Sequence, residues 1–398
     1  MKELKEKLSV QNQLSLFKES SKKDIPLAEL LENKGLNYDN LRYRNYVNGF
    51  SHEEKSHPIE EYLQKSSGVP AVSFFTGAGG MDLGFEYAGF ETIGSFENNE
   101  LFCNTLRINN KKRPVFGPPD FSGDISRRDE IAEILTKKLG VKNSFEGVFH
   151  GGPPCQPFSI ASNQRFRKED GNFKRKGFED EEKGNLLFDY LWLIEKFQPK
   201  AFVIENVSGL KDLDSDGQLY GSLKKLRKVG YKISDPQILN ASYFGVPQNR
   251  LRLFIVGVRN SDQFQFPQIS LFQTPCIDVF DRSSDGLMNN ETRKHTANSV
   301  SRYMELDYGA RDQLGRVDRL NPFLPSKTVI AGGTKGGGRS HLHPYIPRTL
   351  SVRESARLQT FPDNYIFNGS TARQFTQVGN AVPPKLAYSI ANELIKLV

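Results

Sequence analysis

The 398-residue chain has few cysteines, a single tryptophan and no long apolar run. A membrane-spanning helix needs about 20 consecutive apolar residues, and because no run approaches that length we expect no membrane association. The three cysteines, Cys103, Cys155 and Cys276, are odd in number and far apart. That pattern predicts neither a disulfide framework nor a metal site. The N-terminal residues carry too many charges for a secretory signal, so these absences together predict a reduced, cytoplasmic protein.

The composition that is present is ordinary for a soluble protein, with 37% hydrophobic and 25% charged residues. The length exceeds that of one average domain and favours two. The net charge of +7 is unevenly distributed. Residues 165–176 hold six basic and two acidic side chains, whereas residues 1–70 hold 11 of each sign. A local basic excess is typical of proteins that bind nucleic acid, although many basic proteins bind none.

Between residues 70 and 259, short apolar runs alternate with segments of helical spacing. This alternation predicts an α/β fold built on a doubly wound, mostly parallel sheet. Ligands of such sheets bind at the carboxyl ends of the strands, where several polar residues of this chain are expected. The apolar runs are AVSFF (71–75), ETIGSFE (91–97), EGVFHGG (146–152), AFVIENV (201–207) and LRLFIVGVR (251–259), and the helical segments include 185–197 and 221–230.

The remainder of the chain lacks this alternation. Residues 1–69 predict an accessory extension of mostly helical character, a tether or packing arm, with a small helix-turn-helix as the alternative. Residues 260–375 predict a smaller, irregular, β-rich domain with weak strands such as SKTVIAGG (326–333). Residues 376–398 have apolar side chains at helical spacing, and we expect them to complete the domain formed by 70–259.

The glycine-rich stretch FTGAGG (75–80) follows a predicted strand and opens a predicted helix. Glycines there allow the backbone to approach a nucleotide-like ligand at the helix N-terminus, although such turns also need glycine for geometry alone. Glu97 ends the next predicted strand and suits binding of ribose hydroxyls. Asp124, expected at the following strand end, suits an exocyclic amine. Each acid alone is also typical of a helix cap or a solvated loop, but three such strand ends together favour an adenosine-type cofactor.

A second group of polar residues surrounds the stretch GGPPCQPFS (151–159), in which Cys155 follows two glycines and two prolines. Prolines fix the backbone around the thiol, which indicates either a presented nucleophile or a tight surface turn. Glu205 ends a predicted strand, where a carboxyl can move a proton. Arg250 and Arg252 are two apart on a strand, so both point the same way and can hold an electron-rich oxygen. A structural ion pair is the alternative for these three charged residues.

Five sequence motifs, in the order given, resemble the DNA (cytosine-5)-methyltransferases of the bacterial restriction-modification type. They are GGPPCQPFS, AFVIENV, QNRLRLF, RTLSVRESARLQTFPD and QVGNAVPP. The resemblance covers roughly 70–260 and 348–398, and residues 1–69 lie outside it. It implies a Rossmann-like methyltransferase fold for 70–259, completed by 376–398, and a target-recognition domain with its hinge in 260–375. It also implies S-adenosylmethionine as cofactor.

By this resemblance, the cofactor lies against Phe75 and bonds through its ribose to Glu97. Asn98 departs from the family at a position that is often aromatic. The full set of implied cofactor-binding residues is Phe75, Thr76, Gly77, Gly79, Glu97, Asp124, Ile125, Pro154, Leu186, Asn380 and Val382.

The resemblance also implies a mechanism. The Cys155 thiolate would add to carbon 6 of a flipped cytosine, and this addition would make carbon 5 nucleophilic. Glu205 would bind N3 and the exocyclic amine, Arg252 would hold the O2 oxygen, and Arg250 would steady the same corner. The reacting atoms are inaccessible in a stacked duplex, so the base must leave the stack.

The implied macromolecular partner is duplex DNA. A basic segment, 161–184, matches the family's mobile loop, and Thr328 matches a polar position near the flipped nucleotide. Arg339 or His341 would read base edges. The implied DNA-binding residues are Arg165, Arg167, Lys174, Arg175, Lys176, Thr328 and Arg339. We further expect a monomer in the bacterial cytoplasm, associated with the nucleoid, and a cognate restriction endonuclease that acts on the same site without direct contact.

Three other functions fit the sequence less well. A transfer-RNA methyltransferase of the same family would carry a Cys-Phe-Thr signature, which this sequence lacks. A binding protein that has lost catalysis is disfavoured because Cys155, Glu205 and Arg252 are all present. A cysteine hydrolase is disfavoured because His150, only five residues before Cys155, is a poor partner for it.

Overall fold

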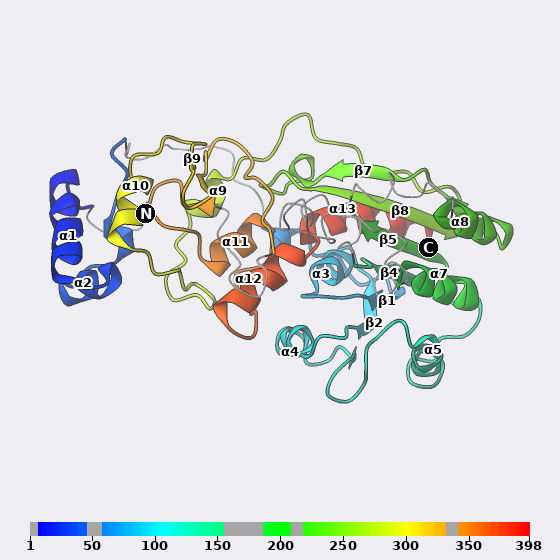
Figure 1. Cartoon of the computed structure of the whole chain (residues 1–398). Helices are drawn as coiled ribbons and strands as arrows, with labels where there is room; N and C mark the ends of the chain where they lie inside the picture. Colours follow the sequence, from blue (N-terminus) through cyan, green and yellow to red (C-terminus); the bar gives the residue numbers. More distant parts are fainter. Residues whose placement is uncertain (1–6, 46–57, 155–185, 208–217, 332–340) are drawn as a thin grey trace. The chain divides into compact units, whose positions relative to one another are not determined.

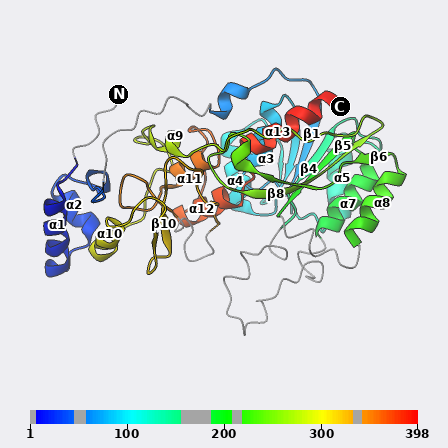
Figure 2. The same cartoon turned by 90° about the horizontal axis from the view of Figure 1, so that it is seen from above.

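The computed structural model describes residues 7–45, 58–154, 186–207, 218–331 and 341–398, and these residues divide into two compact units (Figures 1 and 2). The sheet unit takes its residues from Pro58–Phe244, Arg250–Leu271 and Ala381–Val398. The second unit takes its residues from Met1–His57, Gly245–Asn249 and Phe272–Asn380. Each unit is therefore discontinuous in sequence.

The sheet unit is built on eight described strands in the order β3-β2-β1-β4-β5-β8-β6, with β7 also paired to β8. Strands β1 to β5 pair in parallel, while β8 runs antiparallel to β5, β6 and β7. The predicted α/β fold with a mostly parallel sheet is thus confirmed. The strands are β1 (Pro70–Phe74), β2 (Glu91–Phe96), β3 (Val115–Phe116), β4 (Val148–Gly151), β5 (Ala201–Asn206), β6 (Tyr231–Ile233), β7 (Gln237–Asn240) and β8 (Leu251–Arg259).

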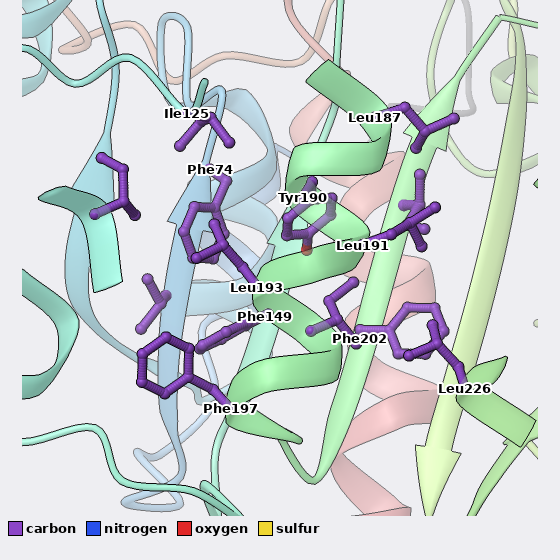
Figure 3. Packing of buried hydrophobic residues seen from close by; sticks show 14 of the residues in the cluster. Phe74, Ile125, Phe149, Leu187, Tyr190, Leu191, Leu193, Phe197, Phe202 and Leu226 are labelled. Carbon is purple, nitrogen blue, oxygen red and sulfur yellow. The ribbon is translucent and has the colours of Figure 1, made fainter. Parts of the chain in front are cut away.

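Helices cover this sheet because each presents an apolar stripe to it. Helix α7 lays Tyr190, Leu193 and Phe197 against the aromatic rings of the central strands, as Figure 3 shows. Tyr190 and Phe149 both contact the Phe74 ring, with centroids 5.1 and 5.0 Å away. The helices of the unit are α3 (Gly80–Tyr87), α4 (Glu100–Asn109), α5 (Arg128–Lys137), α7 (Leu186–Phe197), α8 (Gln218–Lys228) and α13 (Pro384–Leu394), with the 3-10 turns η2 (Ile59–Tyr62), η6 (Ala241–Tyr243) and η7 (Ile395–Leu397).

Helix α13 shows how the end of the chain completes the sheet unit. It packs on α3 so closely that a Cβ at Gly84 would lie 2.5 Å from the Cβ of Ala387. Residues 381–398 belong to the sheet unit, which agrees with the helical, apolar pattern read in that segment. Close backbone approach explains why a glycine stands in the middle of α3.

The second unit combines short helices with a small sheet in the order β11-β10-β9. Its strands are only two or three residues long: β9 (Arg311–Asp312), β10 (Val317–Arg319) and β11 (His341–Leu342). Its helices are α1 (Val10–Lys23), α2 (Leu27–Asn33), α9 (Ile277–Phe280), α10 (Ala297–Tyr303), α11 (Val352–Leu358) and α12 (Thr371–Asn380), with the 3-10 turn η1 (Tyr38–Asn40). In the part of the chain that the structure describes, no helix of either unit is long and apolar enough to cross a membrane.

The boundaries between the two units differ from the expected domain boundaries. Residues 7–45 of the expected extension 1–69 belong to the second unit, whereas residues 58–69 belong to the sheet unit. The sheet unit continues to residue 271 rather than 259 and resumes at 381 rather than 376. The functions assigned to these domains stay predictions.

The weak strand predicted at SKTVIAGG is wrong for its described residues, 326–331. Only Ser326 forms an isolated bridge, to Gln248. Two neighbouring polar groups instead bond to a distant segment: Val329 N donates to Gln248 Oε1 (2.8 Å) and Thr328 Oγ1 donates to the Asn249 carbonyl (2.7 Å). A backbone N–H taken by a side chain is not available to a strand ladder.

Candidate active site

The loop that leads to Cys155 lies against the end of β5. A Cβ at Gly152 would lie 2.7 Å from Glu205 Oε2, and a Cβ at Gly151 would lie 2.9 Å from the Phe74 carbonyl oxygen. Asn206 Nδ2 donates to the Pro153 carbonyl at 3.4 Å. The two glycines therefore permit a close approach that any other residue would obstruct. Cys155 itself lies outside the described residues.

Glu205 sits near the carboxyl end of β5, and Arg252 sits near the start of the antiparallel strand β8. Arg252 Nε lies 2.7 Å from Glu205 Oε1, and both side chains are largely buried. Burial raises the pKa of Glu205, and the positive charges of Arg252 and Arg250 only partly offset that rise. A buried carboxyl with a raised pKa holds a proton more readily than a solvated one and can pass it to a ligand. This geometry is suited to general acid–base chemistry next to the loop of Cys155.

Arg250 makes different contacts from Arg252, although the two are only two residues apart. Arg250 is almost completely buried, and its Nη2 donates to the Ala381 carbonyl at 3.0 Å. Arg252 Nη1 instead donates to the Leu251 carbonyl at 2.7 Å. Arg250 thus ties the start of β8 to the segment before α13, whereas Arg252 contacts the carboxylate directly.

The glycine-rich turn after β1 is shaped by backbone conformations that favour glycine. Phe75, Gly77 and Gly79 have φ values of +53°, +57° and +76°. At Gly77 and Gly79 this left-handed conformation carries no Cβ penalty. Thr76 Oγ1 donates to the Phe96 carbonyl at 3.2 Å, which fastens the turn to the end of β2. The turn therefore lies beside the residue that follows β2, Glu97.

Glu97 is buried, and each of its carboxylate oxygens accepts a backbone N–H. Gly77 N donates to Oε2 and Asn99 N donates to Oε1, both at 2.8 Å. Burial raises the pKa of Glu97, while these backbone donors act in the opposite direction. The carboxylate is thereby oriented, and each oxygen keeps a lone pair for another donor such as a hydroxyl.

Asp124 does not lie at a strand end, so that expectation is wrong. β3 ends at Phe116, and Asp124 lies in the following loop, where its Oδ1 accepts the Ser126 N–H at 3.0 Å. The loop nevertheless returns to β2, because a Cβ at Gly123 would lie 2.1 Å from the Glu97 carbonyl oxygen. Ile125 is buried in the core of the sheet unit. The loop's polar and glycine residues explain why it does not extend the strand.

The remaining predicted cofactor residues lie in both units. Pro154 and Leu186 are half-buried and Val382 is buried, all in the sheet unit. Asn380 is exposed at the end of α12, in the second unit. The donor set of the sheet unit fits S-adenosylmethionine: an oriented carboxylate for ribose hydroxyls, a glycine turn, and apolar side chains for the adenine. The roles of these residues stay predictions.

A buried cluster beneath the glycine-rich turn was missed by sequence reasoning. Asp82, in the first turn of α3, accepts from Ser73 Oγ at 2.6 Å, Ser95 Oγ at 2.8 Å and Arg113 Nη1 at 3.1 Å. It therefore joins β1, β2 and α3 under the turn. The signal available was a serine near the end of each of two buried strands, because a buried hydroxyl calls for a polar partner.

The predicted DNA-binding residues are described only in part. Thr328 is half-buried in the second unit. His341 is buried on β11, where it pairs in the ladder with Asp318, and burial lowers its pKa to about 4. The suggestion that His341 reads base edges is therefore wrong, because its side chain is not accessible. The other predicted contacts, Arg165, Arg167, Lys174, Arg175, Lys176 and Arg339, lie outside the described residues.

Comparisons with known proteins find similar sequences and similar folds. The family model for C-5 cytosine-specific DNA methylases matches residues 69–396. Among curated relatives, the Type II methyltransferase M.PspPI of Psychrobacter sp. is 30% identical over 85% of this chain and 82% of its own length. M.NgoFVII of Neisseria gonorrhoeae is 31% identical over 84% of this chain and 89% of its own.

Two solved structures share the fold. A protein described as a DNA modification methyltransferase from an Escherichia coli prophage has a TM-score of 0.65 and 24% identity, covering 83% of this chain and 99% of its own. The Entamoeba histolytica methyltransferase EhMeth has a TM-score of 0.55 and 18% identity, covering 84% and 99%. At these identities the likeness concerns the fold.

Proposed function

This chain belongs to the C-5 cytosine-specific DNA methylases, and from that premise we propose that it methylates carbon 5 of a flipped cytosine at a specific duplex DNA sequence. Its activity is that of a DNA (cytosine-5)-methyltransferase. Because the curated relatives are Type II methyltransferases, we place it in a restriction-modification system. A cognate endonuclease would then act on the same site without contacting this chain.

The observation that carries the proposed mechanism is the contact between Glu205 and the loop before Cys155. Carbon 5 of cytosine is too weak a nucleophile to take a methyl group unaided. Addition of the Cys155 thiolate to carbon 6 makes an enamine and moves electron density to carbon 5. Glu205, with its raised pKa, gives a proton to N3 as the ring becomes electron-rich. After the transfer a base removes the carbon-5 proton and the thiolate leaves by elimination.

The two arginines then have separate roles. Arg252 orients Glu205 through its Nε and turns remaining donors toward the O2 oxygen of the base. Arg250 would not touch the base. It would hold the start of β8, and with it Arg252, in place through its hydrogen bond to the Ala381 carbonyl. Arg252 is thus proposed to contact substrate, and Arg250 to position it.

S-adenosylmethionine supplies the electrophilic methyl group when bound. Glu97 would accept the ribose hydroxyls, and Phe75 would lie against the adenine. Thr76, Gly77 and Gly79 shape the turn beside them. The remaining members of the pocket would be Asp124, Ile125, Pro154, Leu186, Asn380 and Val382.

The base must leave the stack before these groups can reach it. Arg165, Arg167 and Lys174–Lys176 would hold phosphates, so binding would weaken steeply with salt. Thr328 would lie near the flipped nucleotide, and Arg339 would read a base edge. We further propose a monomer associated with the nucleoid of the bacterial cytoplasm.

A trapping experiment tests the mechanism. With S-adenosylmethionine and duplex DNA carrying 5-fluorocytosine, the protein should form an adduct that survives denaturing electrophoresis, because fluorine cannot leave as a proton does. Cys155→Ala should form no adduct and transfer no methyl group while binding the cofactor normally. Cys276→Ala is the matched control, since Cys276 is buried in the second unit, and it should be trapped like the wild type. Methyl transfer by Cys155→Ala would overturn the mechanism.

The target sequence is tested separately. Bisulfite sequencing of plasmid DNA from cells that express the protein should show protected cytosines in one sequence context. Methylation without any common context would contradict sequence specificity.

A further inference from the structure

The N-terminal helices form part of the core of the second unit. Leu16 and Phe17 of α1 and Leu30 and Leu31 of α2 pack in one cluster with residues of α10. The members from α10 and the residue after it are Ala297, Val300 and Met304. Fully buried apolar side chains of this kind stabilise a unit by about 1.5–3 kcal/mol each. Residues 8–45 are therefore integral to the second unit rather than an appendage to it.

Tyr43 and Asn45 surround a buried arginine of the small sheet. Arg319 on β10 lies with its guanidinium carbon 3.5 Å from the Tyr43 ring centroid, a cation–π contact. Its Nη1 donates to Asn45 Oδ1 at 2.6 Å, and its Nε donates to the Pro344 carbonyl at 2.9 Å. Tyr43 Oη donates to the neighbouring His343 carbonyl at 2.9 Å. Tyr43 thus supports Arg319 and the backbone after β11 at once.

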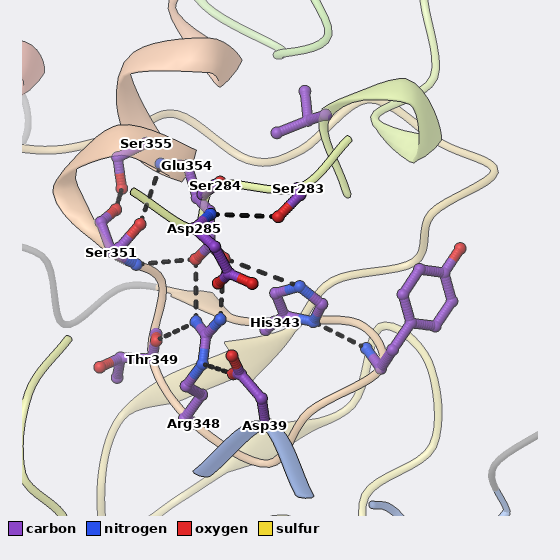
Figure 4. A network of polar contacts seen from close by, with 12 residues as sticks. Asp39, Ser283, Ser284, Asp285, His343, Arg348, Thr349, Ser351, Glu354 and Ser355 are labelled. Atoms are coloured by element: carbon purple, nitrogen blue, oxygen red, sulfur yellow. Dashed lines mark hydrogen bonds and ion pairs between the residues drawn. The ribbon is translucent and has the colours of Figure 1, made fainter. Parts of the chain in front are cut away.

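Asp39 reaches a second buried arginine just beyond that backbone. Arg348 Nε donates to Asp39 Oδ1 at 3.2 Å, as Figure 4 shows. The other end of the guanidinium forms a bidentate pair with Glu354, at 2.9 and 2.8 Å. Glu354 also accepts the Ser351 N–H and so closes the N-terminal cap of α11. Tyr43 therefore contacts the start of segment 343–351, at His343, and Asp39 contacts it further along, at Arg348.

Strand β10, which carries Arg319, is also linked to the segment that contains Thr328. Asp318 precedes Arg319 on β10, and its carboxylate pairs with Lys327 Nζ at 3.1 Å. Lys327 is next to Thr328, whose hydroxyl is fixed on the Asn249 carbonyl. Side-chain contacts and neighbouring positions in the chain therefore link Tyr43, through β10, to the half-buried Thr328.

We infer that residues 8–45 are a positioning element of the DNA-reading unit, in which Tyr43 and Asp39 hold β10 and segment 343–351 in the arrangement that DNA binding requires. The inference rests on the proposed function, because it takes the second unit to be the part that reads DNA. Tyr43 and Asp39 touch no substrate in this scheme. They act through Arg319 and Arg348.

The test compares Tyr43→Phe and Asp39→Asn with the wild type. Tyr43→Phe keeps the ring over Arg319 and removes only the hydrogen bond to His343. We expect KM for duplex DNA to rise about fivefold, as loss of one hydrogen bond implies. The rate ratio between the cognate site and a site with one altered base pair should also fall. kcat at saturating DNA and the dissociation constant of S-adenosylmethionine should not change.

Tyr231→Phe is the matched control. Tyr231 is buried in the sheet unit, and its hydroxyl donates to the Pro199 carbonyl, so the variant loses the same kind of bond outside the DNA-reading unit. It should lower the unfolding temperature without raising KM for DNA. If Tyr43→Phe and Asp39→Asn behave like Tyr231→Phe, the segment is merely structural and the inference fails.

Failure of the proposed function would look different. A wild-type protein that transfers no methyl group to DNA would contradict the proposed function, whatever the variants do. Duplex binding by fluorescence anisotropy, measured on the same proteins, then still tests the inference: Tyr43→Phe should bind about fivefold more weakly than the wild type, and equal binding would overturn it.

Discussion

Two buried glutamates, one in each unit, have pKa values displaced in opposite directions. In the sheet unit, burial raises the pKa of Glu205, and its nearest cation offsets this only in part. In the second unit, burial likewise favours the neutral form of Glu354, but Arg348 outweighs it and brings the pKa to about 2. Both side chains are similarly buried, at 8% and 4% exposure, so burial alone cannot explain the difference.

The number of donors on each carboxylate explains it. Glu354 accepts two hydrogen bonds from Arg348 and a third from the Ser351 N–H, which satisfies the charged form. Among the residues that the structure describes, Glu205 has a single close ion pair, to Arg252 Nε. A carboxylate that is fully paired serves as a structural anchor. One that is paired on a single side remains able to exchange a proton with a ligand.

The largest expected effect is on catalysis. Glu205→Gln should lower kcat/KM for methyl transfer by about 10²–10⁴-fold, because the amide cannot give a proton to the base. Its unfolding free energy at pH 7 should not fall, since the substitution removes a buried charge whose pKa is raised. Transfer of labelled methyl groups and urea unfolding measure the two quantities.

Glu146→Gln is the matched control for that variant. Glu146 is a mostly exposed glutamate of the same unit, paired with Arg259 at 3.2 Å. Its substitution should leave kcat/KM unchanged. A Glu205→Gln enzyme with wild-type activity would remove the contrast between the two glutamates.

The second effect is on stability. Glu354→Gln should lower the unfolding free energy by about 3 kcal/mol, because it leaves the buried Arg348 without its bidentate partner. Glu305→Gln removes an exposed pair with Arg44 in the same unit and should cost less than about 1 kcal/mol. If urea unfolding shows that both variants lose the same unfolding free energy, the buried Glu354–Arg348 pair does not stabilise the unit more than an exposed pair.

The smallest effect is the pH dependence of that stability difference. The pKa of Glu354 is depressed, so its contribution is present above the unfolded-state value of about 4.3. The contribution is lost as the pH falls from there toward the folded-state pKa of about 2. The gap between the wild type and Glu354→Gln, followed by urea unfolding from pH 7 to pH 3, should therefore narrow on acidification.

Glu205 should show the reverse sign. Its folded-state pKa is raised, so its contribution to stability is present below the unfolded-state value and is lost as the pH rises through the folded one. Glu205→Gln and the wild type should therefore converge in stability at low pH and diverge at higher pH. Parallel pH profiles for the two glutamates would contradict their assignment to different roles.

The main strands of the sheet unit could be predicted because they bury apolar runs, whereas the short strands β3, β6 and β7 were not predicted. The run 251–259 is β8 itself, and the helical pattern of 185–197 becomes α7, Leu186–Phe197. Fully covered strands of a mostly parallel sheet are apolar on both faces, so their sequences carry the signal locally. The candidate residues Glu97 and Glu205 follow from the same pattern, because they stand where such runs end.

The part of the second unit around β10 and α11 could not be predicted in this way, because buried charged side chains hold it together. Arg319 and Arg353 are fully buried, whereas an arginine in sequence normally indicates a solvated surface. Arg353 donates to the carbonyls of Met288, Pro362 and Tyr365. Segments outside a sheet ladder leave such carbonyls without partners, and a guanidinium with five donors can satisfy several of them.

By itself, then, the amino-acid sequence determined the main strands of the sheet, several of its helices, the family and the residues proposed for the reaction, since each depends on a local pattern or motif. Only the tertiary structure decided which partners those residues meet. Gly152 lies against Glu205 across 53 positions of sequence, and Tyr43 holds the carbonyl of His343 across 300. Contacts of this kind depend on how closely backbones approach and on which buried polar groups lack a partner, and neither quantity is encoded in a neighbouring residue.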